Sequence, residues 1–485
     1  MNRNRNRTAA PRRCSPRLAA LLAMGLASGC ATAGAVPPQS GARSAQPDGR
    51  TAAGIIPAGR GSDPSSWTMY GRVPGHNAVV TEPRNSPPAS SWSFGVPGAV
   101  ANPAAIPSAA VPAWRDLVGF PIGVSVAAGT VYAPNDNGTV YALSATTGRQ
   151  RWAFQAHNEV MSTPLVVEAG GRRLVVVGAG NSDFSYSQAV RFGAPGAQVV
   201  RGTGISAVDA VNALTGKLVW TFPTKGEDMP TPVAVGGRLI FADGGGHVVA
   251  LDPATGKQLW RTSIGSFVSM SSLDVSGSTV VFGGTHPSRF YGIDAATGKE
   301  LWAVEPPSVF SSSMGDGTPA VAGTTAVLQI ETVSKMPGLA GSEELAIDTV
   351  NHRLLWSAAL GTGKVPPRNK DASPIVVGSS VYTASPVTGD AYCIDLATGA
   401  VKWRTPVPGR VKAPPVLVGG RLLFPTASGT VVAVDAADGA VVHVWTGTHG
   451  GFGPQGITVV GETAFVGTNL GWMQAIPLRL LTGRP

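Results

Sequence analysis

The sequence has little cysteine and little charge for its length. Three of its 485 residues are cysteine, and 13% are charged. Once the leader described below is removed, only Cys30 and Cys393 remain, which leaves no disulfide framework if Cys30 is lipidated. The chain also has no C-x-x-C-H haem motif, no phosphate-binding loop and no nucleophile elbow. The common sequence signals of covalent haem, nucleotide phosphates and an activated serine are therefore missing.

Excess positive charge is confined to the N-terminus. The formal net charge is +9, but residues 1–29 hold six arginines and no acidic residue. The rest of the chain has 31 basic and 28 acidic residues, a net charge of +3. This balance, without basic runs interleaved with aromatics, predicts no nucleic-acid partner.

The N-terminal residues resemble an export signal. The apolar segment Leu18–Cys30 follows the arginines and is too short to span a bilayer. Its end, LASGC, resembles the lipoprotein cleavage box, in which Cys30 becomes the acylated first residue. We expect a lipoprotein-type signal peptide at 1–29, a flexible tether at 30–63 and a folded body at 64–485. A soluble secreted product is the alternative, and Arg12-Arg13 also allows twin-arginine export.

One phrase, ALDPATGKQLW at Ala250–Trp260, recurs along the chain. Seven copies align on the Asp position, six with Gly four residues later and six with Trp eight residues later. The aligned positions are Ser144, Asn212, Asp252, Asp294, Asp348, Asp395 and Asp435. Most neighbouring copies lie 40 to 54 residues apart, a period typical of propeller blades or of helical repeats.

The residues of the phrase favour strands over helices. GHVVALD and KQLWRT alternate and contain β-branched residues, whereas a helical repeat would space its apolar residues by three and four. Between them, D-P-A-T-G supplies a turn in which Asp accepts backbone N–H bonds and Gly takes a positive φ. Another pair of short strands precedes each copy, as in TPVAVGGRLIFADG. The chain is thus predicted to be an all-β propeller of four-stranded antiparallel blades.

An eighth blade must be assembled from the two ends of the chain. Residues 461–478 supply inner strands with no following Trp strand, and SSWSFGV at 90–96 has the Trp-strand pattern with no preceding hairpin. We therefore predict an eight-bladed β-propeller whose last blade is closed by an N-terminal strand, which removes an exposed sheet edge. Nine blades is the alternative count.

The recurring tryptophans are predicted to be structural docking residues between neighbouring blades. Burying such a ring contributes roughly 4 to 6 kcal/mol as an upper bound. The residues are Trp92, Trp152, Trp220, Trp260, Trp302, Trp356 and Trp403. Cys393 occupies the Ala position of one copy, where we expect an inert core thiol.

The pattern A-x-D-x-x-T-G-x-x-x-W resembles the tryptophan-docking motif of the pyrroloquinoline-quinone (PQQ) repeat propellers. Ala250–Trp260 matches it in full, and the resemblance covers roughly residues 67–480. The family includes quinoprotein dehydrogenases and the lipoprotein subunit of the outer-membrane β-barrel assembly machinery. A dehydrogenase would need PQQ, a calcium site and an Asp base, and many members have an adjacent cysteine pair. This chain has no such pair and no matching set of metal ligands.

One position in the innermost strands is predicted to form a ring around the channel. It lies three residues before a recurring Pro or its equivalent, and its occupants are Met161, Met229, Met270, Asp316, Asp371 and Lys412. Three methionines could bind a soft metal such as Cu(I), although apolar packing at the channel mouth is the simpler interpretation, so we assign no metal ligands. The carboxylates are candidates for chemistry or else solvated channel residues.

An insertion at 180–204 accounts for the longest interval between copies. It carries aromatic and arginine residues, a combination enriched at protein interfaces. The candidate partner-binding residues are Phe184, Tyr186, Arg191, Phe192 and Arg201. A loop that merely covers the blade surface is the alternative.

The resemblance to the barrel-assembly lipoprotein implies a non-catalytic, extracytoplasmic lipoprotein propeller that binds a protein partner in the cell envelope. We expect membrane contact through the lipid anchor, at the periplasmic face of the outer membrane if the host has one. We further expect no cofactor, and a monomer outside its complex. The alternatives are an alcohol or sugar dehydrogenase dependent on PQQ and calcium, and a secreted or surface polymer-binding propeller.

Overall fold

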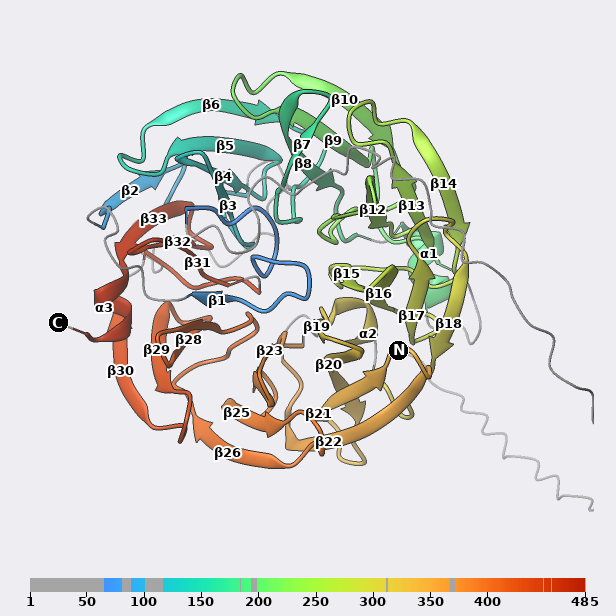
Figure 1. Ribbon diagram of the computed structural model, residues 1–485, viewed down its shortest axis with the longest axis vertical. Helices are drawn as coiled ribbons and strands as arrows, with labels where there is room; N and C mark the ends of the chain where they lie inside the picture. Colours follow the sequence, from blue (N-terminus) through green and yellow to red (C-terminus); the bar gives the residue numbers. More distant parts are fainter. Residues whose placement is uncertain are drawn as a thin grey trace, which may run out of the picture. The chain divides into compact units, whose positions relative to one another are not determined.

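The computed structural model describes most of the folded body. Its described residues are 65–80, 89–100, 117–183, 185–192, 199–310, 313–366, 371–447, 449–454 and 456–484. The predicted signal peptide, the tether and Cys30 lie outside these residues. Within them, strands form eight sheets around a central channel, and successive blades follow one another around the ring (Figure 1). The predicted all-β fold with eight blades is confirmed.

Blades one to seven each take four consecutive strands, counted from the channel outward. Blades one to four consist of β3 (Ser125–Ala127), β4 (Thr130–Pro134), β5 (Thr139–Ser144) and β6 (Gln150–Gln155); β7 (Leu165–Ala169), β8 (Arg172–Ala179), β9 (Ala207–Asn212) and β10 (Leu218–Pro223); β11 (Val233–Val235), β12 (Arg238–Ala242), β13 (His247–Leu251) and β14 (Gln258–Ser263); and β15 (Asp274–Ser276), β16 (Thr279–Gly284), β17 (Arg289–Asp294) and β18 (Glu300–Val304).

The second half of the ring repeats this arrangement. Blades five to eight consist of β19 (Ala320–Ala322), β20 (Thr325–Val333), β21 (Leu339–Asp348) and β22 (Arg353–Lys364); β23 (Ile375–Val377), β24 (Ser380–Ser385), β25 (Asp390–Asp395) and β26 (Val401–Pro406); β27 (Val416–Val418), β28 (Arg421–Pro425), β29 (Thr430–Asp435) and β30 (Val441–Thr446); and β31 (Thr458–Val460), β32 (Thr463–Gly467), β33 (Trp472–Pro477) and β2 (Trp92–Gly95). The helices are α1 (Tyr186–Phe192), α2 (Ser313–Asp316) and α3 (Leu478–Thr482). None of the helices described has the length and apolar character needed to cross a bilayer.

The burial of each strand follows its place in the blade. Middle strands such as β13 are almost wholly buried, because neighbouring blades cover both of their faces. Outer strands such as β14 alternate between exposed and half-buried side chains. A bulge gives β14 one extra residue, Leu259, beside the pair formed by Ala250 and Trp260. The alternation in the sequence therefore marks the outer strands, and continuous apolar runs mark the middle ones.

The N-terminal part of the chain closes the ring. Strand β2 pairs antiparallel with β33, with Trp92 opposite Ala475, so the predicted closure of the last blade is confirmed. The Thr458 hydroxyl donates to the Val124 carbonyl across 2.8 Å and joins blade eight to blade one. Strand β1 (Val79–Val80) adds to the inner edge of blade seven, where it runs parallel to β27.

Six of the seven docking tryptophans contact the turn glycine of the next blade, as Trp260 illustrates. Its indole N–H donates to the Ala295 carbonyl across 3.2 Å, and a Cβ on Gly298 would lie 2.5 Å from the indole ring. Gly298 also has a φ of +74°, which few other residues adopt. The same contacts pair Trp92 with Gly148, Trp152 with Gly216, Trp220 with Gly256, Trp356 with Gly399, and Trp403 with Gly439.

Trp302 departs from this arrangement because the next blade has His352 at the glycine position. The two rings stack with centroids 5.6 Å apart, and His352 itself takes a φ of +57°. The Trp302 ring lies over Gly292, at the position where five other copies have Ala and one has Cys393, and a Cβ there would overlap it. The Trp302 indole N–H has no hydrogen-bond partner among the described residues.

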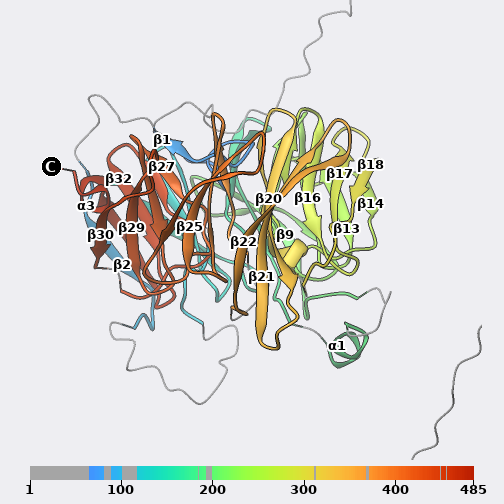
Figure 2. The same cartoon turned by 90° about the horizontal axis from the view of Figure 1, so that it is seen from below.

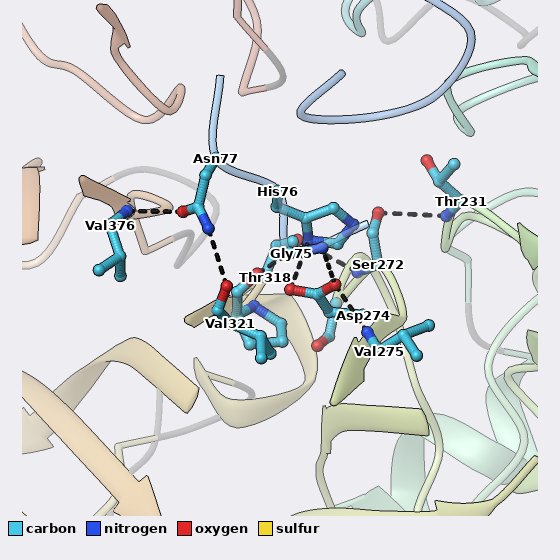
Figure 3. A network of polar contacts seen from close by, with 12 residues as sticks. Gly75, His76, Asn77, Thr231, Ser272, Asp274, Val275, Thr318, Val321 and Val376 are labelled. Carbon is cyan, nitrogen blue, oxygen red and sulfur yellow. Dashed lines mark hydrogen bonds and ion pairs between the residues drawn. The ribbon is translucent and has the colours of Figure 1, made fainter. Parts of the chain in front are cut away.

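The innermost strands are joined by serine and threonine hydroxyls. The Thr163 N–H donates to the Thr231 hydroxyl, and the Thr231 N–H donates to the Ser272 hydroxyl, each across 3.1 Å. The Ser272 N–H donates in turn to the Thr318 hydroxyl, also across 3.1 Å (Figure 3). These residues belong to the recurring [ST]-P pattern or its equivalent, which therefore links blades two to five around the channel.

Candidate functional site: the closed central channel

An N-terminal strap, defined here as residues 65–80, closes one end of the channel. The strap and α1 lie on opposite faces of the ring (Figure 2). Trp67 exchanges two backbone hydrogen bonds with Val126 in blade one, and the Thr68 carbonyl accepts from Val166 in blade two. At its other end, β1 pairs with blade seven. The strap thus crosses the channel and contacts inner strands on both sides of it.

The middle of the strap is fixed by Gly75, His76 and Asn77 (Figure 3). The Gly75 N–H donates to the Asp274 carboxylate across 2.6 Å, and His76 Nδ1 lies 3.6 Å from the same group. The Asn77 side chain donates to the Val321 carbonyl and accepts from the Val376 N–H, at 2.8 and 2.6 Å. These contacts reach blades four, five and six. The strap is therefore held across this end of the channel by specific hydrogen bonds to three blades.

Tyr70 projects from the strap into the channel. Its ring meets the His76 ring edge to face, with centroids 4.8 Å apart. Burial raises the pKa of the Tyr70 phenol, so the hydroxyl stays protonated. Above it lies a small, narrow pocket. The lining residues are Tyr70, Met270, Asp316, Thr318, Asp371, Ser373, Lys412 and Pro454.

Two buried carboxyl groups, Asp316 and Asp371, line this pocket, and a third, Glu331, lies beside them. The Ser313 hydroxyl, at the start of α2, donates to Asp371 across 2.7 Å and accepts from the Glu331 N–H across 2.7 Å. Burial raises the pKa of Glu331 to about 7; Lys412 opposes this shift and Asp316 adds to it. Burial and the nearby Glu331 raise the pKa of Asp371 well above its usual value. The cluster therefore holds a proton at neutral pH.

A second layer of polar side chains supports this cluster. The Gln329 side chain accepts from the Ala372 N–H across 3.0 Å and donates to the Ala384 carbonyl across 2.7 Å. It also lies 3.3 Å from the Glu344 carboxyl group. Burial raises the pKa of Glu344 to about 8. Blades five and six are thus tied together directly behind Asp371.

Two cations complete the electrostatics of the site. Burial lowers the pKa of Lys412, while Glu331, Asp316 and Asp371 act in the opposite direction. Arg201 Nη1 lies 4.0 Å from the Asp316 carboxylate. Buried acids beside cations can exchange protons with a bound molecule while the cations attract an anion. The pocket can therefore perform acid–base chemistry on an anionic ligand.

The predicted channel ring divides into two environments. Met161, Met229 and Met270 pack against one another in a buried apolar cluster on blades two to four. Asp316, Asp371 and Lys412, on blades five to seven, line the pocket, and Met270 borders both environments. Sequence reasoning placed all six at the channel. It missed Glu331, although polar residues within the apolar strand TAVLQIETV were a usable signal.

Within the described part of the channel, the acidic side chains do not form a calcium site of the kind a PQQ dehydrogenase needs. Among the described residues, no group of three or more His, Cys, Asp or Glu side chains is arranged to hold a metal ion. Tyr70 and the strap also fill one end of the channel. We therefore derive no step through either group. Cys393 lies away from the pocket, buried opposite Trp403, and burial raises the pKa of its thiol.

The insertion residues do not form one surface in the part of the chain that is described. Arg191 is exposed on α1, whereas Arg201 turns inward to the channel. Phe184 lies outside the described residues, as do the side chains of Tyr186 and Phe192. Partner binding by this insertion stays a prediction, and Arg201 belongs with the channel residues.

The fold and the repeated docking motif define the protein as a PQQ-repeat propeller. The family model described as "Outer membrane protein assembly factor BamB" matches residues 101–189, 205–385 and 342–484, and the chain belongs to this family. It is 30% identical over 445 residues to the tetrathionate hydrolase of Acidithiobacillus ferrooxidans, covering 87% of this chain and 88% of that one. It is 28% identical over 458 residues to the tetrathionate hydrolase of Acidianus ambivalens, covering 86% and 84%.

Structural similarity supports the fold alone. The crystal structure of BamB from Moraxella catarrhalis superposes with a TM-score of 0.55 at 15% identity, covering 74% of this chain and 97% of that one. Curated BamB sequences match only 28% and 30% of this chain.

The prediction of a non-catalytic scaffold is therefore wrong. The relatives that span nearly the whole chain are named as enzymes, whereas the assembly factors match it only in part. The docking motif could not reveal this, because it lies in the outer strands. The channel position did carry a signal, since ionisable residues replace methionine on three consecutive blades.

Proposed function

We propose that the protein is a hydrolase of tetrathionate or a closely related polythionate, with the channel pocket as its active site. The observation that carries this proposal is the similarity to two tetrathionate hydrolases over 87% and 86% of the chain. The pocket supports it, because buried carboxyl groups and two cations meet there. The predicted export signal and the Cys30 anchor would place this activity outside the cytoplasm.

The substrate chemistry matches the charges of the pocket. Tetrathionate is a linear dianion with a sulfonate at each end and sulfur–sulfur bonds between them. In its hydrolysis the water oxygen bonds to a sulfonate sulfur and a sulfur–sulfur bond breaks. The electron pair leaves with the remaining sulfur chain, and two protons are released. The reaction therefore needs a base for water, a proton source beside the leaving sulfur, and cations near the sulfonates.

The three carboxyl groups divide between these roles. Glu331 and Asp371 hold protons because burial raises the pKa of each, so we assign them as the proton source. Asp316 lines the pocket and has Arg201 4.0 Å away, so we assign it as the base that accepts the water proton. Lys412, also in the pocket wall, would bind a sulfonate.

The direct test is incubation of the full-length protein with tetrathionate. The first step gives sulfate and a three-sulfur chain, which becomes thiosulfate by losing one sulfur atom. Ion chromatography would follow the loss of substrate and the release of sulfate and thiosulfate, with elemental sulfur and acid release followed in parallel. Asp316→Asn and Asp371→Asn should each lower kcat by about 100-fold or more. Asp438→Asn is the matched control, because Asp438 lies in an exposed turn and accepts only a local N–H. If the wild type leaves tetrathionate and its shorter and longer homologues intact between pH 3 and 8, the proposal is wrong.

The pH profile supplies an independent test. If Glu331 acts in its protonated form, activity is present at low pH and is lost as pH rises through about 7, the pKa of Glu331. Glu331→Gln keeps the shape of the side chain but cannot titrate, so it should remove this alkaline limb along with most of the activity. A rate that rises through pH 7 would contradict the assignment.

A further inference from the structure

We propose that Arg201 is a positioning residue of the active site, supplied by the insertion between β8 and β9. This inference rests on the proposed function and extends it. Arg201 belongs to the chain segment of blade two, yet its side chain reaches the carboxylate of Asp316, which precedes the first strand of blade five. The end of the insertion therefore contributes a residue to the proposed active site.

The backbone of Arg201 is built into the loops of blade three. Its N–H donates to the Gly244 carbonyl across 3.0 Å, and its carbonyl accepts from the Glu227 N–H across 2.7 Å. A Cβ on Gly226 or on Gly244 would overlap the Arg201 carbonyl oxygen. The close approach requires glycine at both positions, so the end of the insertion is held in a fixed place.

The side chain of Arg201 is equally constrained. Nε donates to the Ser182 carbonyl across 3.1 Å, and Nη1 donates to the Ser269 hydroxyl across 2.7 Å. The guanidinium lies 6.0 Å from the centre of the Phe267 ring, within the range of a cation–π contact. Hydrogen bonds from two directions and a flat apolar surface leave this side chain little rotational freedom.

Ser269 connects Arg201 to the helix that presents Asp316. The N–H groups of residues 269–271 all donate to the Gly315 carbonyl, at 2.9 to 3.1 Å. Gly315 lies within α2, which ends at Asp316. Arg201 therefore acts on Asp316 in two ways: through charge across 4.0 Å, and through Ser269 and the backbone of α2.

The charges around this arrangement explain why an arginine is needed. Asp316 and Glu227 have side chains only 4% and 0% exposed, and Arg201 lies within 4.0 Å of both. Removing the cation would leave two buried acids without their shared counter-charge, which is costly.

The test compares Arg201→Gln and Arg201→Lys with Arg191→Gln, a control in the same insertion on exposed α1. We expect Arg201→Gln to lower kcat for tetrathionate by about 10-fold to 100-fold, with a smaller change in KM. Arg201→Lys should restore part of kcat, since it keeps the charge but not the forked hydrogen bonds.

The outcomes separate the two proposals. An inactive wild type overturns the proposed function before Arg201 is considered. An active wild type with kcat and KM of Arg201→Gln equal to those of Arg191→Gln overturns the inference. If Arg201→Gln does not fold, as judged by circular dichroism and thermal unfolding, Arg201→Lys decides. A lowered kcat of Arg201→Lys with little change in KM supports positioning, and wild-type kinetics refute it.

Discussion

Glu344 offers the sharpest test of how burial controls this site. Its carboxyl group is fully buried between blades five and six, 3.3 Å from Gln329, and one of its oxygens has no partner among the described residues. Burial raises its pKa from 4.5 to about 8. The folded protein therefore binds this proton more tightly than the unfolded chain does. The resulting stability is fully present below about pH 4.5 and is lost as pH rises through about 8.

The size of the effect follows from that shift. Between pH 4 and pH 7, titration of Glu344 should reduce the free energy of unfolding by about 3 kcal/mol. This value follows from a pKa of 4.5 in the unfolded chain and about 8 in the folded protein. Glu344→Gln has nearly the same shape and cannot ionise. Its free energy of unfolding should therefore fall less than that of the wild type over the same range. Glu331 and Asp371 also titrate, so the comparison must be the difference between the two proteins.

Denaturant unfolding at pH 4, 5.5, 7 and 8 would measure this difference. Glu343→Gln is the matched control, because Glu343 is the neighbouring residue of β21, is less buried and bonds to Ser357 near the surface. The control should follow the wild-type pH dependence. If Glu344→Gln follows it as well, Glu344 does not carry a raised pKa, and the account of a proton-holding layer behind Asp371 is wrong.

Three further predictions test the contacts between blades and the burial of side chains within them. Trp260→Ala should lower the free energy of unfolding by about 3 to 5 kcal/mol, whereas Leu259→Ala on the exposed side of β14 should have little effect; equal melting of the two variants would refute the docking role. Gly298→Ala should destabilise more than Gly277→Ala in thermal unfolding, because both have a positive φ but only Gly298 meets an indole ring. Cys393 should react with a thiol reagent only as fast as the protein unfolds; rapid reaction of the native protein would contradict its burial.

The fold was predictable because one local phrase contains most of the information that builds a blade. Its Asp fixes the turn: the Asp252 carboxylate accepts from both the N–H and the hydroxyl of Thr255, at 2.9 and 2.8 Å. Its Gly and Trp form the contact between blades. The strap carries no comparable local pattern. Gly75 bonds to Asp274 and Asn77 bonds to Val376 across hundreds of residues of chain, so no periodicity could reveal them.

The function was predicted wrongly for a related physical reason. The docking motif acts at the outer strands, where Trp260 meets Gly298, and this contact is indifferent to what lines the channel. A scaffold and a hydrolase can therefore share it. What distinguishes this chain is the uneven channel, with methionine on blades two to four and Asp316, Asp371 and Lys412 on blades five to seven. A uniform ring would give every blade the same environment. Here the strap closes the channel beneath the ionisable half, and the buried proton that acid–base chemistry requires is held there.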